Sequence, residues 1–494
     1  MSELMIWRSG ISRSVEFEGV PLLCEVLAQA GILLDHPCGG RGVCGKCTAE
    51  VSGQVSAPNE VEQQAGHRLT CQVRLLGDAQ VWLPELGKEL VEISGTTQTA
   101  GNPMAGRYGS AVDIGTTTLA LKLFDLRTGK LLAAEGKMNP QRAVAADVMG
   151  RISAAMAGQA AYLQGLVRDA VAQMLDHACK AANIRKESLS VMVVTGNTTM
   201  LYLITGRNPE CLSHAPFLAD TLFDFYSELL GKTVYYPPCM NAFVGADITC
   251  AVLASEMYRN PQTSLLCDIG TNGEIALWKD GKLYVTSTAA GPAFEGAGIS
   301  CGCGSIPGAI DRVWVENGKI QCHTIGDVPA IGICGSGLID AIAAFLKIGV
   351  IDETGATLVD ILPLKNGICL LPKDVRAIQL AKAAIHSGIQ TLLESAGVPE
   401  DEIAVLYIAG GFGSHLNVVS AAAIGLIPVG LQNRVHILGN AALSGAGEIL
   451  LNRDHLEIIR AIAKESTHLN LGGTPQFNAH YIEQMLFCDQ DGQT

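Results

Sequence analysis

Four cysteines near the start of the chain have a spacing that suits metal binding. Five residues separate Cys38 from Cys44, two separate Cys44 from Cys47, and Cys71 follows after 23 intervening residues. Cysteine thiolates hold iron–sulfur clusters, and sets of four also hold structural zinc. The other cysteines of the 16 in the chain are scattered, and we expect them to be buried thiols, because cysteine packs as a small hydrophobic residue. The four spaced cysteines are therefore the candidate metal ligands.

The loop that carries three of these cysteines is rich in glycine, HPCGGRGVCGKC. Without a Cβ, a glycine lets backbone amides approach the sulfides of a cluster, and such hydrogen bonds tune its potential. Zinc sites seldom have such a loop, and the downstream partner here is one cysteine rather than a second pair. The loop resembles that of 2Fe–2S ferredoxins with five residues between the first two ligands. The resemblance implies a 2Fe–2S cluster bound by the four cysteines, with zinc as the alternative.

A second candidate site comes from two similar hairpins. Asp113-Ile-Gly-Thr-Thr-Thr and Asp268-Ile-Gly-Thr-Asn-Gly each follow a short apolar strand, and each precedes a second strand and a turn with a Gly-Lys pair. This pattern is typical of a β-hairpin. Two copies about 155 residues apart indicate a duplicated α/β domain with a cleft between its halves.

The chemistry of these turns suits phosphate. Glycines in tight turns let backbone N–H groups reach phosphate oxygens, and each aspartate can face a hydrated Mg²⁺ on those phosphates. A later apolar strand ends in Ile408-Ala-Gly-Gly-Phe-Gly. The three motifs resemble the first phosphate, second phosphate and adenosine motifs of the actin, sugar-kinase and heat-shock-chaperone superfamily; an inert fold that has lost ATP is the alternative. The predicted ATP-binding residues are Gly115, Thr116, Thr117, Gly270, Thr271, Asn272, Gly273, Gly410, Gly411 and Gly413.

Further polar residues lie between and after the two turns. Asp247 precedes a helical stretch, where the superfamily often has an acidic residue that orients the attacking water. We therefore predict Asp247 as catalytic together with Asp113 and Asp268, with a helix N-cap as the alternative for Asp247. Asn197 is expected to cap a helix that faces the cleft. Glu295, in a glycine-rich loop, receives no definite role.

The elements around the cysteine loop predict a small β-grasp domain. We expect strands at residues 4–8, 15–17, 48–51 and 81–84, and a helix at 22–30. This β-β-α-loop-β order suits a β-grasp domain of the α+β class over residues 1–93, and the resemblance of the cysteine loop implies that it is a 2Fe–2S ferredoxin domain.

The rest of the chain predicts a linker and the duplicated domain. Residues 94–109 are small, polar and nearly uncharged, which is typical of a flexible linker of up to about 50 Å. The α/β actin-like (ribonuclease-H-like) ATPase domain follows in two halves, 110–262 and 263–494, the second with C-terminal helices. Expected helices at 143–157, 162–182 and 375–396 alternate with strands at 190–194 and 405–409; a helix at 454–465, a strand at 469–471 and a helix at 475–487 follow.

Charge and hydropathy exclude two classes of partner. The net charge of −14 and the pI of about 5.3 would repel a phosphate backbone, so no nucleic-acid partner is expected. No apolar run approaches the roughly 20 residues that span a bilayer, and residues 1–10 lack the apolar core of a signal peptide. We expect a soluble, cytoplasmic protein without a membrane partner.

The whole chain resembles the reductive activators of corrinoid proteins. The strings that carry the resemblance, besides the motifs above, are Thr288-Ala-Ala-Gly-Pro-Ala-Phe-Glu-Gly-Ala, Ile333-Cys-Gly-Ser-Gly-Leu-Ile-Asp and residues 475–487. The resemblance implies ATP-dependent, one-electron reduction of an inactive Co(II) corrinoid to Co(I), which rescues methyltransferases after oxidation. It also implies a corrinoid protein of a methyltransferase system as partner, a low-potential electron donor, and a homodimer.

Two departures from that family and two other functions stay open. The chain leaves no room for the extra linker and middle domains of longer members. Cys301-Gly-Cys303 is an additional cysteine pair, either packed small residues or a second redox or metal site. The alternative functions are a small-molecule kinase with a regulatory redox head, and a non-catalytic scaffold that senses ATP and cluster state.

Overall fold

The structure, a computed structural model, describes residues 1–8, 10–34, 36, 40–42, 46–84, 91–95, 97, 101–411 and 415–487. The chain divides into two compact units. The first unit combines residues 1–88 with 140–167, and the second combines 89–139 with 168–494.

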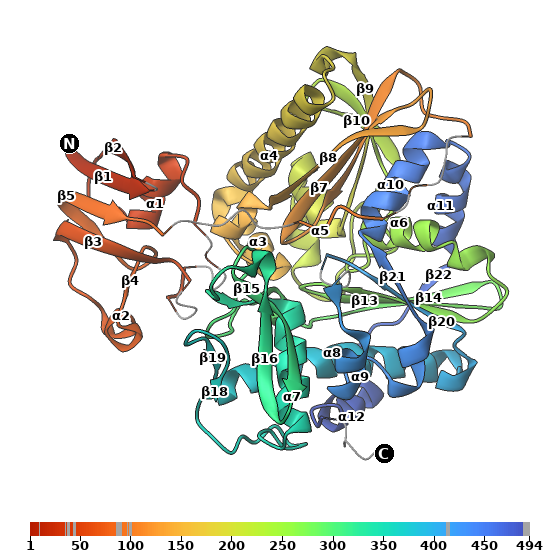
Figure 1. Ribbon diagram of the computed structural model, residues 1–494. Helices are drawn as coiled ribbons and strands as arrows, with labels where there is room; N and C mark the ends of the chain where they lie inside the picture. Colours follow the sequence, from red (N-terminus) through yellow and green to blue (C-terminus); the bar gives the residue numbers. More distant parts are fainter. Residues whose placement is uncertain are drawn as a thin grey trace. The chain divides into compact units, whose positions relative to one another are not determined.

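The first unit is built on a five-stranded sheet with one helix against it (Figure 1). The strand order is β2 (Ile11–Phe17), β1 (Ser2–Arg8), β5 (Leu75–Trp82), β3 (Thr48–Val55) and β4 (Arg68–Leu69). Among these described strands, only the β1–β5 pair is parallel. Alternate residues of β5 are buried, because side chains of a strand point to opposite faces. They share one apolar core with Leu23, Val26 and Leu27 of α1 (Leu23–Gln29). The expected β-grasp class is confirmed.

Two features of this unit differ from the expected elements. Helix α2 (Glu60–Ala65) and strand β4 follow β3 and were not expected. The helix expected at 143–157 is shorter: it consists of α3 (Val148–Ala154), which begins where Asp147 accepts a hydrogen bond from the Gly150 N–H (2.7 Å), and of one π-helical turn, η2 (Ala155–Gln159). Gly158 has a φ of 93° inside that turn, so the backbone departs from regular helix before α4 (Ala160–Ala181).

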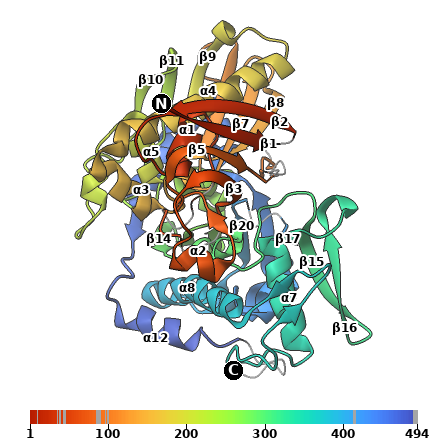
Figure 2. The ribbon, with the colours of Figure 1, turned by 90° about the vertical axis from the view of Figure 1, so that its left-hand side faces the viewer.

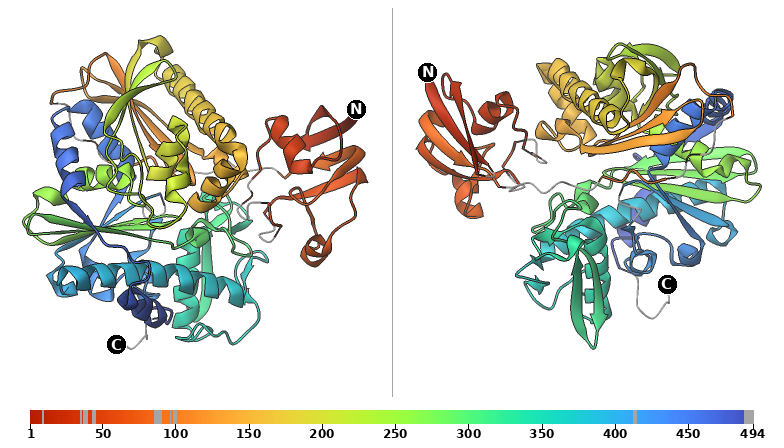
Figure 3. Two further views of the ribbon diagram at one scale, coloured as in Figure 1. Left: turned by 180° about the vertical axis from the view of Figure 1, so that it is seen from behind. Right: turned by 45° about the horizontal axis from the view of Figure 1, so that its top comes forward.

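The second unit contains two six-stranded sheets with the same central order (Figure 3). The first sheet runs β10 (Phe225–Leu229), β11 (Lys232–Tyr236), β9 (Leu189–Gly196), β6 (Tyr108–Ile114), β7 (Thr118–Asp125), β8 (Lys130–Met138). The second runs β21 (Val435–Gly439), β20 (Val405–Ala409), β12 (Ser264–Ile269), β13 (Gly273–Lys279), β14 (Lys282–Thr288), β22 (Ser466–His468). β6 and β12 each lie between an antiparallel hairpin partner and a parallel strand. The expected duplication is confirmed.

Helices α6 (Ala246–Ser255) and α10 (Ala441–Leu451) pack on each other and belong to one apolar core to which both sheets contribute. Their approach is very close at Gly445, where an added Cβ would stand 2.0 Å from the carbonyl oxygen of Cys250. Only a glycine fits at that crossing. The two halves are therefore joined through a helix pair in direct backbone contact.

The remaining elements of the second unit complete its layers. Helix α12 (Pro475–Glu483) lies along α8 (Pro372–Ala396) (Figure 2). The others are α5 (Thr198–Thr205), α7 (Gly335–Lys347), α9 (Val418–Ala423), α11 (His455–Glu465), β15 (Ala309–Glu316), β16 (Lys319–Thr324), β17 (Gly332–Ile333), β18 (Leu362–Pro363) and β19 (Cys369–Leu370). The strand expected at 469–471 ends earlier, at His468, because β22 takes its register from β14. No helix in the described ranges is long and apolar enough to cross a membrane.

The described part of the expected linker, 94–109, belongs to the second unit. The carbonyl oxygen of Ser94 accepts a hydrogen bond from the Asn440 N–H (3.2 Å), and that of Gly95 accepts from Lys122 Nζ (2.9 Å). Met104 is buried and donates its N–H to the carbonyl of Leu450 (3.0 Å). The described residues are thus held by hydrogen bonds and apolar burial rather than extended in solvent. The domain limits given above remain a prediction.

Candidate functional site

The first Asp-Ile-Gly-Thr turn, residues 115–117 (the first turn), connects β6 to β7. Asp113, near the end of β6, accepts a hydrogen bond from the Asn440 side-chain amide at 2.9 Å. The Gly115 N–H donates to the carbonyl of Thr118 at 2.9 Å, which closes the turn. Asn197, which caps α5 as expected, donates to Thr116 Oγ1 at 3.0 Å. The turn is thus held both by its own backbone and by side chains from distant segments of the unit.

The second Asp-Ile-Gly-Thr turn, residues 270–272 (the second turn), connects β12 to β13 and has an additional carboxyl. Asp268 pairs across the hairpin with Glu274, so the two side chains lie on one face of the sheet. The equivalent partner of Asp113 is Ala120. The two copies therefore differ in chemistry: only the second turn has a cross-strand pair of carboxyls.

The structure brings the two turns together. Thr117 Oγ1 of the first turn lies 3.1 Å from Thr271 Oγ1 of the second. Both hydroxyls also donate to the carboxylate of Glu295, at 2.8 Å and 2.9 Å. Residues far apart in the sequence thus meet at one point, as the predicted phosphate site requires.

Four carboxyls on the elements that carry or adjoin the two turns have raised pKa values. Burial raises the pKa of Asp113 to about 6, against the bond from Asn440. Burial and the charge of Asp113 raise the pKa of Asp268 to about 7, and burial with both charges raises that of Asp247 to about 8. For Glu274, burial and the charges of Asp247 and Asp268 raise the pKa well above its usual value. The charge of Asp113 thus makes ionisation of Asp268 and Asp247 more costly, and a cation near them would reduce this cost.

Asp247 is not the N-cap of its helix, so that alternative is wrong. Gly245 occupies the N-cap position of α6, and Asp247 lies in the first helical turn. Its carboxylate accepts a hydrogen bond from the N–H of Ile248 at 2.8 Å. An added Cβ at Gly245 would stand 2.5 Å from the Asn197 Cα, so close packing of the backbone there leaves the cap without a side chain. The catalytic role of Asp247 remains a prediction.

The strand-end glycines of the adenosine motif lie beside the second turn. β20 pairs with β12 so that Ala409 is opposite Asp268. Gly410 follows with a φ of 94°, and an added Cβ would stand 2.5 Å from Asp268 Oδ1. Gly410 is therefore required both by its backbone conformation and by the neighbouring carboxylate. Gly411 is exposed, and Gly413 lies outside the described residues.

These residues fit Mg²⁺–ATP. Mg²⁺ usually keeps several of its waters and is bound together with the phosphates, so Asp113, Asp247 and Asp268 would face its hydration shell. The charge of Asp113 raises the pKa of Asp268, and the charges of both raise that of Asp247, so a cation nearby would offset this repulsion. Gly410 leaves room beside Asp268 that any side chain would fill. The assignment of these side chains to the nucleotide stays a prediction.

Two of the four predicted cluster ligands are described, and they adjoin each other. Cys47 Sγ lies 3.3 Å from Cys71 Sγ, and both side chains are buried. The hydrogen bond from the Cys71 thiol, aided by His36 and opposed by burial, lowers the pKa of Cys47 to about 4. A thiolate is the form that binds iron, so this pair fits an iron–sulfur cluster. Cys38 and Cys44 lie outside the described residues.

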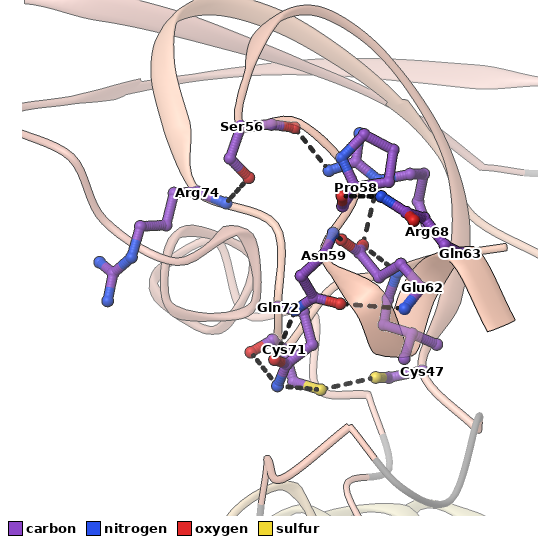
Figure 4. Close-up of polar contacts among 11 residues, drawn as sticks. Cys47, Ser56, Pro58, Asn59, Glu62, Gln63, Arg68, Cys71, Gln72 and Arg74 are labelled. Carbon is purple, nitrogen blue, oxygen red and sulfur yellow. Dashed lines mark hydrogen bonds and ion pairs between the residues drawn. The ribbon is translucent and has the colours of Figure 1, made fainter. Parts of the chain in front are cut away.

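A polar network supports this thiol pair (Figure 4). Gln72 donates through Nε2 to Cys71 Sγ at 3.5 Å and to the carbonyl of Gly40 at 2.7 Å. Asn59 donates to Gln72 Oε1 at 3.0 Å, and buried Glu62 pairs with Arg68 at 3.0 Å. Glu62 also accepts the N–H of Leu69 (2.9 Å), which lies between the two cysteines in sequence. α2 thus braces the segment that carries Cys71.

Three of the other described cysteines bear on the predicted metal sites. Cys24 lies on α1, where burial raises its pKa to about 11, so it stays a thiol and packs beside the site. The Cys301 thiol donates to the carbonyl of Cys369 at 2.6 Å, and the Cys303 N–H donates to the carbonyl of Ile333 at 2.9 Å. Among the residues that the structure describes, no group of three or more His, Cys, Asp and Glu side chains is arranged to hold a metal.

Sequence reasoning missed Glu274, Asn440, Gln72 and α2. The Asn59-Glu-Val-Glu62 pattern is a capping box, in which each side chain bonds the other residue's N–H, and it would have predicted the start of α2. Glu274 was detectable from the register of the second hairpin, because residues opposite each other share a face. The contact of Asn440 with Asp113, 327 positions earlier, has no local signal.

An actin-like nucleotide-binding domain joined to a 2Fe–2S ferredoxin domain defines the class of this protein. Three family models match it: the 2Fe–2S iron–sulfur cluster binding domain over residues 8–76, the RACo middle region over 108–260, and the C-terminal ASKHA domain of RACo over 262–494. The match over 108–260 corrects the expectation that the family's middle domain is absent, because that region coincides with the first half of the duplicated domain.

Similar proteins point to one family. The corrinoid activation enzyme RamQ of Eubacterium limosum is 36% identical over 420 residues, 77% of this chain and 70% of that protein. The Co(II) methylated amine-specific corrinoid protein reductase of Methanosarcina barkeri is 27% identical over 78% of this chain and 77% of that protein. A solved reductive activator for corrinoid, iron–sulfur protein is 26% identical with a TM-score of 0.71, covering 99% of this chain and 98% of the other. The chain belongs to the family of reductive activators of corrinoid proteins.

Proposed function

We propose that this protein uses ATP to support the one-electron reduction of an inactive Co(II) corrinoid to Co(I) on a partner corrinoid protein. The observation that carries the proposal is that one chain of this family contains both a buried thiol pair, Cys47 and Cys71, and two phosphate-type turns with buried aspartates, Asp113 and Asp268, beside them. Relatives named as corrinoid activation enzyme and corrinoid protein reductase favour this function over a small-molecule kinase or a scaffold.

The first part of the mechanism is nucleotide binding by the two turns. Asp113, Asp247 and Asp268 would face a hydrated Mg²⁺, which would neutralise phosphate charge. The N–H groups of Gly115 and Gly270 close their own turns by donating to the carbonyls of Thr118 and Asn272. The other backbone N–H groups of the two turns would approach the phosphates, and Gly410 and Gly411 would let the adenosine lie against the backbone. Asp247 orients the attacking water.

The second part is electron transfer through the first unit. Cys38, Cys44, Cys47 and Cys71 would hold a 2Fe–2S cluster, which would serve as a one-electron carrier. Gln72 donates to Cys71 Sγ, and a donor to a ligand sulfur raises the potential of such a site. We expect a low-potential cytoplasmic donor to supply the electron, and a homodimer is compatible with the family.

ATP can support the reduction of the corrinoid only if it binds two conformational states of the protein with different affinity. The α6–α10 crossing at Gly445 joins the two halves through backbone contact, so a change between the turns is transmitted to both sheets. We propose that this change alters docking of the corrinoid protein.

The test is an anaerobic reduction assay. Purified protein, reductant and an oxidised corrinoid protein are combined, and Co(I) absorption is followed with and without ATP. We expect formation of Co(I) to require ATP, and Asp113→Ala or Asp268→Ala to abolish ATP turnover with an unchanged cluster spectrum. Asp280→Asn, at the exposed β13–β14 turn, is the matched control. Equal Co(I) yields without ATP would refute the role of the nucleotide.

A further inference from the structure

Glu295 holds the two turns to each other through their hydroxyls. It ends the short helical turn η6 (Pro292–Glu295), which follows β14. Glu295 Oε2 accepts from Thr117 Oγ1 of the first turn at 2.8 Å and from Thr271 Oγ1 of the second at 2.9 Å, and Oε1 lies 2.9 Å from Thr271 Oγ1. A single carboxylate thus bridges a first-half residue and a second-half residue 154 positions apart.

The bridge uses the same donors that would bind phosphate. A threonine hydroxyl has one hydrogen to donate. While Thr117 and Thr271 both donate to Glu295, neither hydroxyl can donate to a phosphate oxygen. A carboxylate and a phosphate on the same pair of hydroxyls would also repel each other, because both are anions a few ångströms apart.

We propose that Glu295 is an internal competitor of the nucleotide: its carboxylate occupies the phosphate position between the two turns, and ATP must displace it. The proposal rests on the nucleotide site of the proposed function. It assigns Glu295 to positioning of the turns rather than to the chemical step.

The loop that carries Glu295 can transmit its displacement. Gly296 follows Glu295 with a φ of 76°, and an added Cβ at Gly302 would stand 2.2 Å from the Gly296 carbonyl oxygen. The Gly302–Cys303 backbone in turn pairs with Ile333, which precedes α7. Backbone contact without intervening side chains couples rigidly, so release of Glu295 would shift the 301–303 loop and the start of α7. Displacement of Glu295 would therefore also move Cys301 and Cys303.

The test measures binding of Mg²⁺ with a non-hydrolysable ATP analogue, AMP-PNP, to the full chain by calorimetry. We expect Glu295→Ala to bind the analogue about tenfold more tightly than wild type. Glu295→Gln, which keeps the shape and one acceptor but removes the charge, should show a smaller gain. Glu316→Ala, at an exposed site on β15, should bind as wild type does.

A double variant separates competition from a general loosening of the loop. If Glu295 competes for the hydroxyls, adding Thr117→Ala to Glu295→Ala should remove most of the gain, because the freed donor is lost. Equal or weaker binding by both Glu295 variants would overturn the proposal while the nucleotide site stands. Absence of binding by wild type and by every Glu295 variant would overturn the nucleotide site together with it.

Discussion

Replacing Asp268 by asparagine should stabilise the nucleotide-free protein and at the same time abolish nucleotide binding. Burial and the charge of Asp113 raise the pKa of Asp268 to about 7 from its ordinary value of 3.8. The folded chain therefore holds a proton on Asp268 that the unfolded chain releases between pH 4 and 7. Stability from this group is present at low pH and is lost as the pH rises towards 7.

The size of the effect follows from the shift. Each pKa unit corresponds to about 1.4 kcal/mol, so the raised pKa of Asp268 costs up to about 4 kcal/mol at pH 8, where the folded chain holds an ionised carboxylate. At pH 5 the cost is about 2 kcal/mol, because the folded chain keeps a proton that the unfolded chain has released. The asparagine side chain of the variant carries no charge at either pH. Asp268→Asn should therefore raise the free energy of unfolding at pH 8 by up to about 4 kcal/mol, with the gain roughly halved at pH 5.

The assay is urea unfolding followed by tryptophan fluorescence, since Trp278 lies on β13 of the second hairpin. Mg²⁺–ATP at 100 times its Kd should stabilise wild type by about 2.7 kcal/mol and leave Asp268→Asn unchanged. Asp280→Asn removes an exposed charge from the β13–β14 turn. It should change neither the free energy of unfolding nor the stabilisation by Mg²⁺–ATP. A gain that is equal at pH 5 and pH 8, or no gain at pH 8, would refute the view that a buried, coupled carboxylate is held there for a cation.

Three further predictions test other parts of the site. Cys71→Ser should remove the visible absorption of the anaerobically purified protein. Cys24→Ser should keep this absorption, because the raised pKa of Cys24, about 11, leaves a thiol that binds no iron. Loss of the absorption in both variants would contradict the ligand assignment. Gly410→Ala should weaken Mg²⁺–ATP binding by roughly tenfold or more, because its Cβ would stand 2.5 Å from Asp268 Oδ1. The control is Gly281→Ala, which also has a positive φ but has no atom within 4 Å of an added Cβ, and it should affect stability alone. Equal Mg²⁺–ATP binding by the two variants would contradict the steric argument. Asn440→Ala should lower the free energy of unfolding by about 1 kcal/mol, because it removes the N-cap of α10. It should also raise the pKa of Asp113 further, because the Asn440 amide donates to that carboxylate. A pH dependence of nucleotide binding that is the same as in wild type would contradict this second effect.

The sequence predicted the elements that depend on local pattern. Strand β20 spans 405–409 as expected, because a short apolar run between polar segments is unambiguous there. The Asp-Ile-Gly-Thr repeat predicted the duplication, because the same supersecondary unit needs the same turn chemistry. α2 was overlooked although its capping box is local, and the helix expected at 143–157 was placed too early because Asp147 caps α3 at its start.

The sequence alone determined which acidic and glycine-rich motifs the chain contains. These motifs indicated the kind of ligand. Only the tertiary structure decided that Asn440 bonds Asp113 and that Glu295 joins Thr117 to Thr271. The bonds from Asn440 to Asp113 and from Thr117 to Glu295 join segments more than 150 positions apart, where sheet order and the α6–α10 crossing bring the chain together. Hydrogen bonds of this kind depend on atoms within about 3 Å, and local residue patterns contain no such distances.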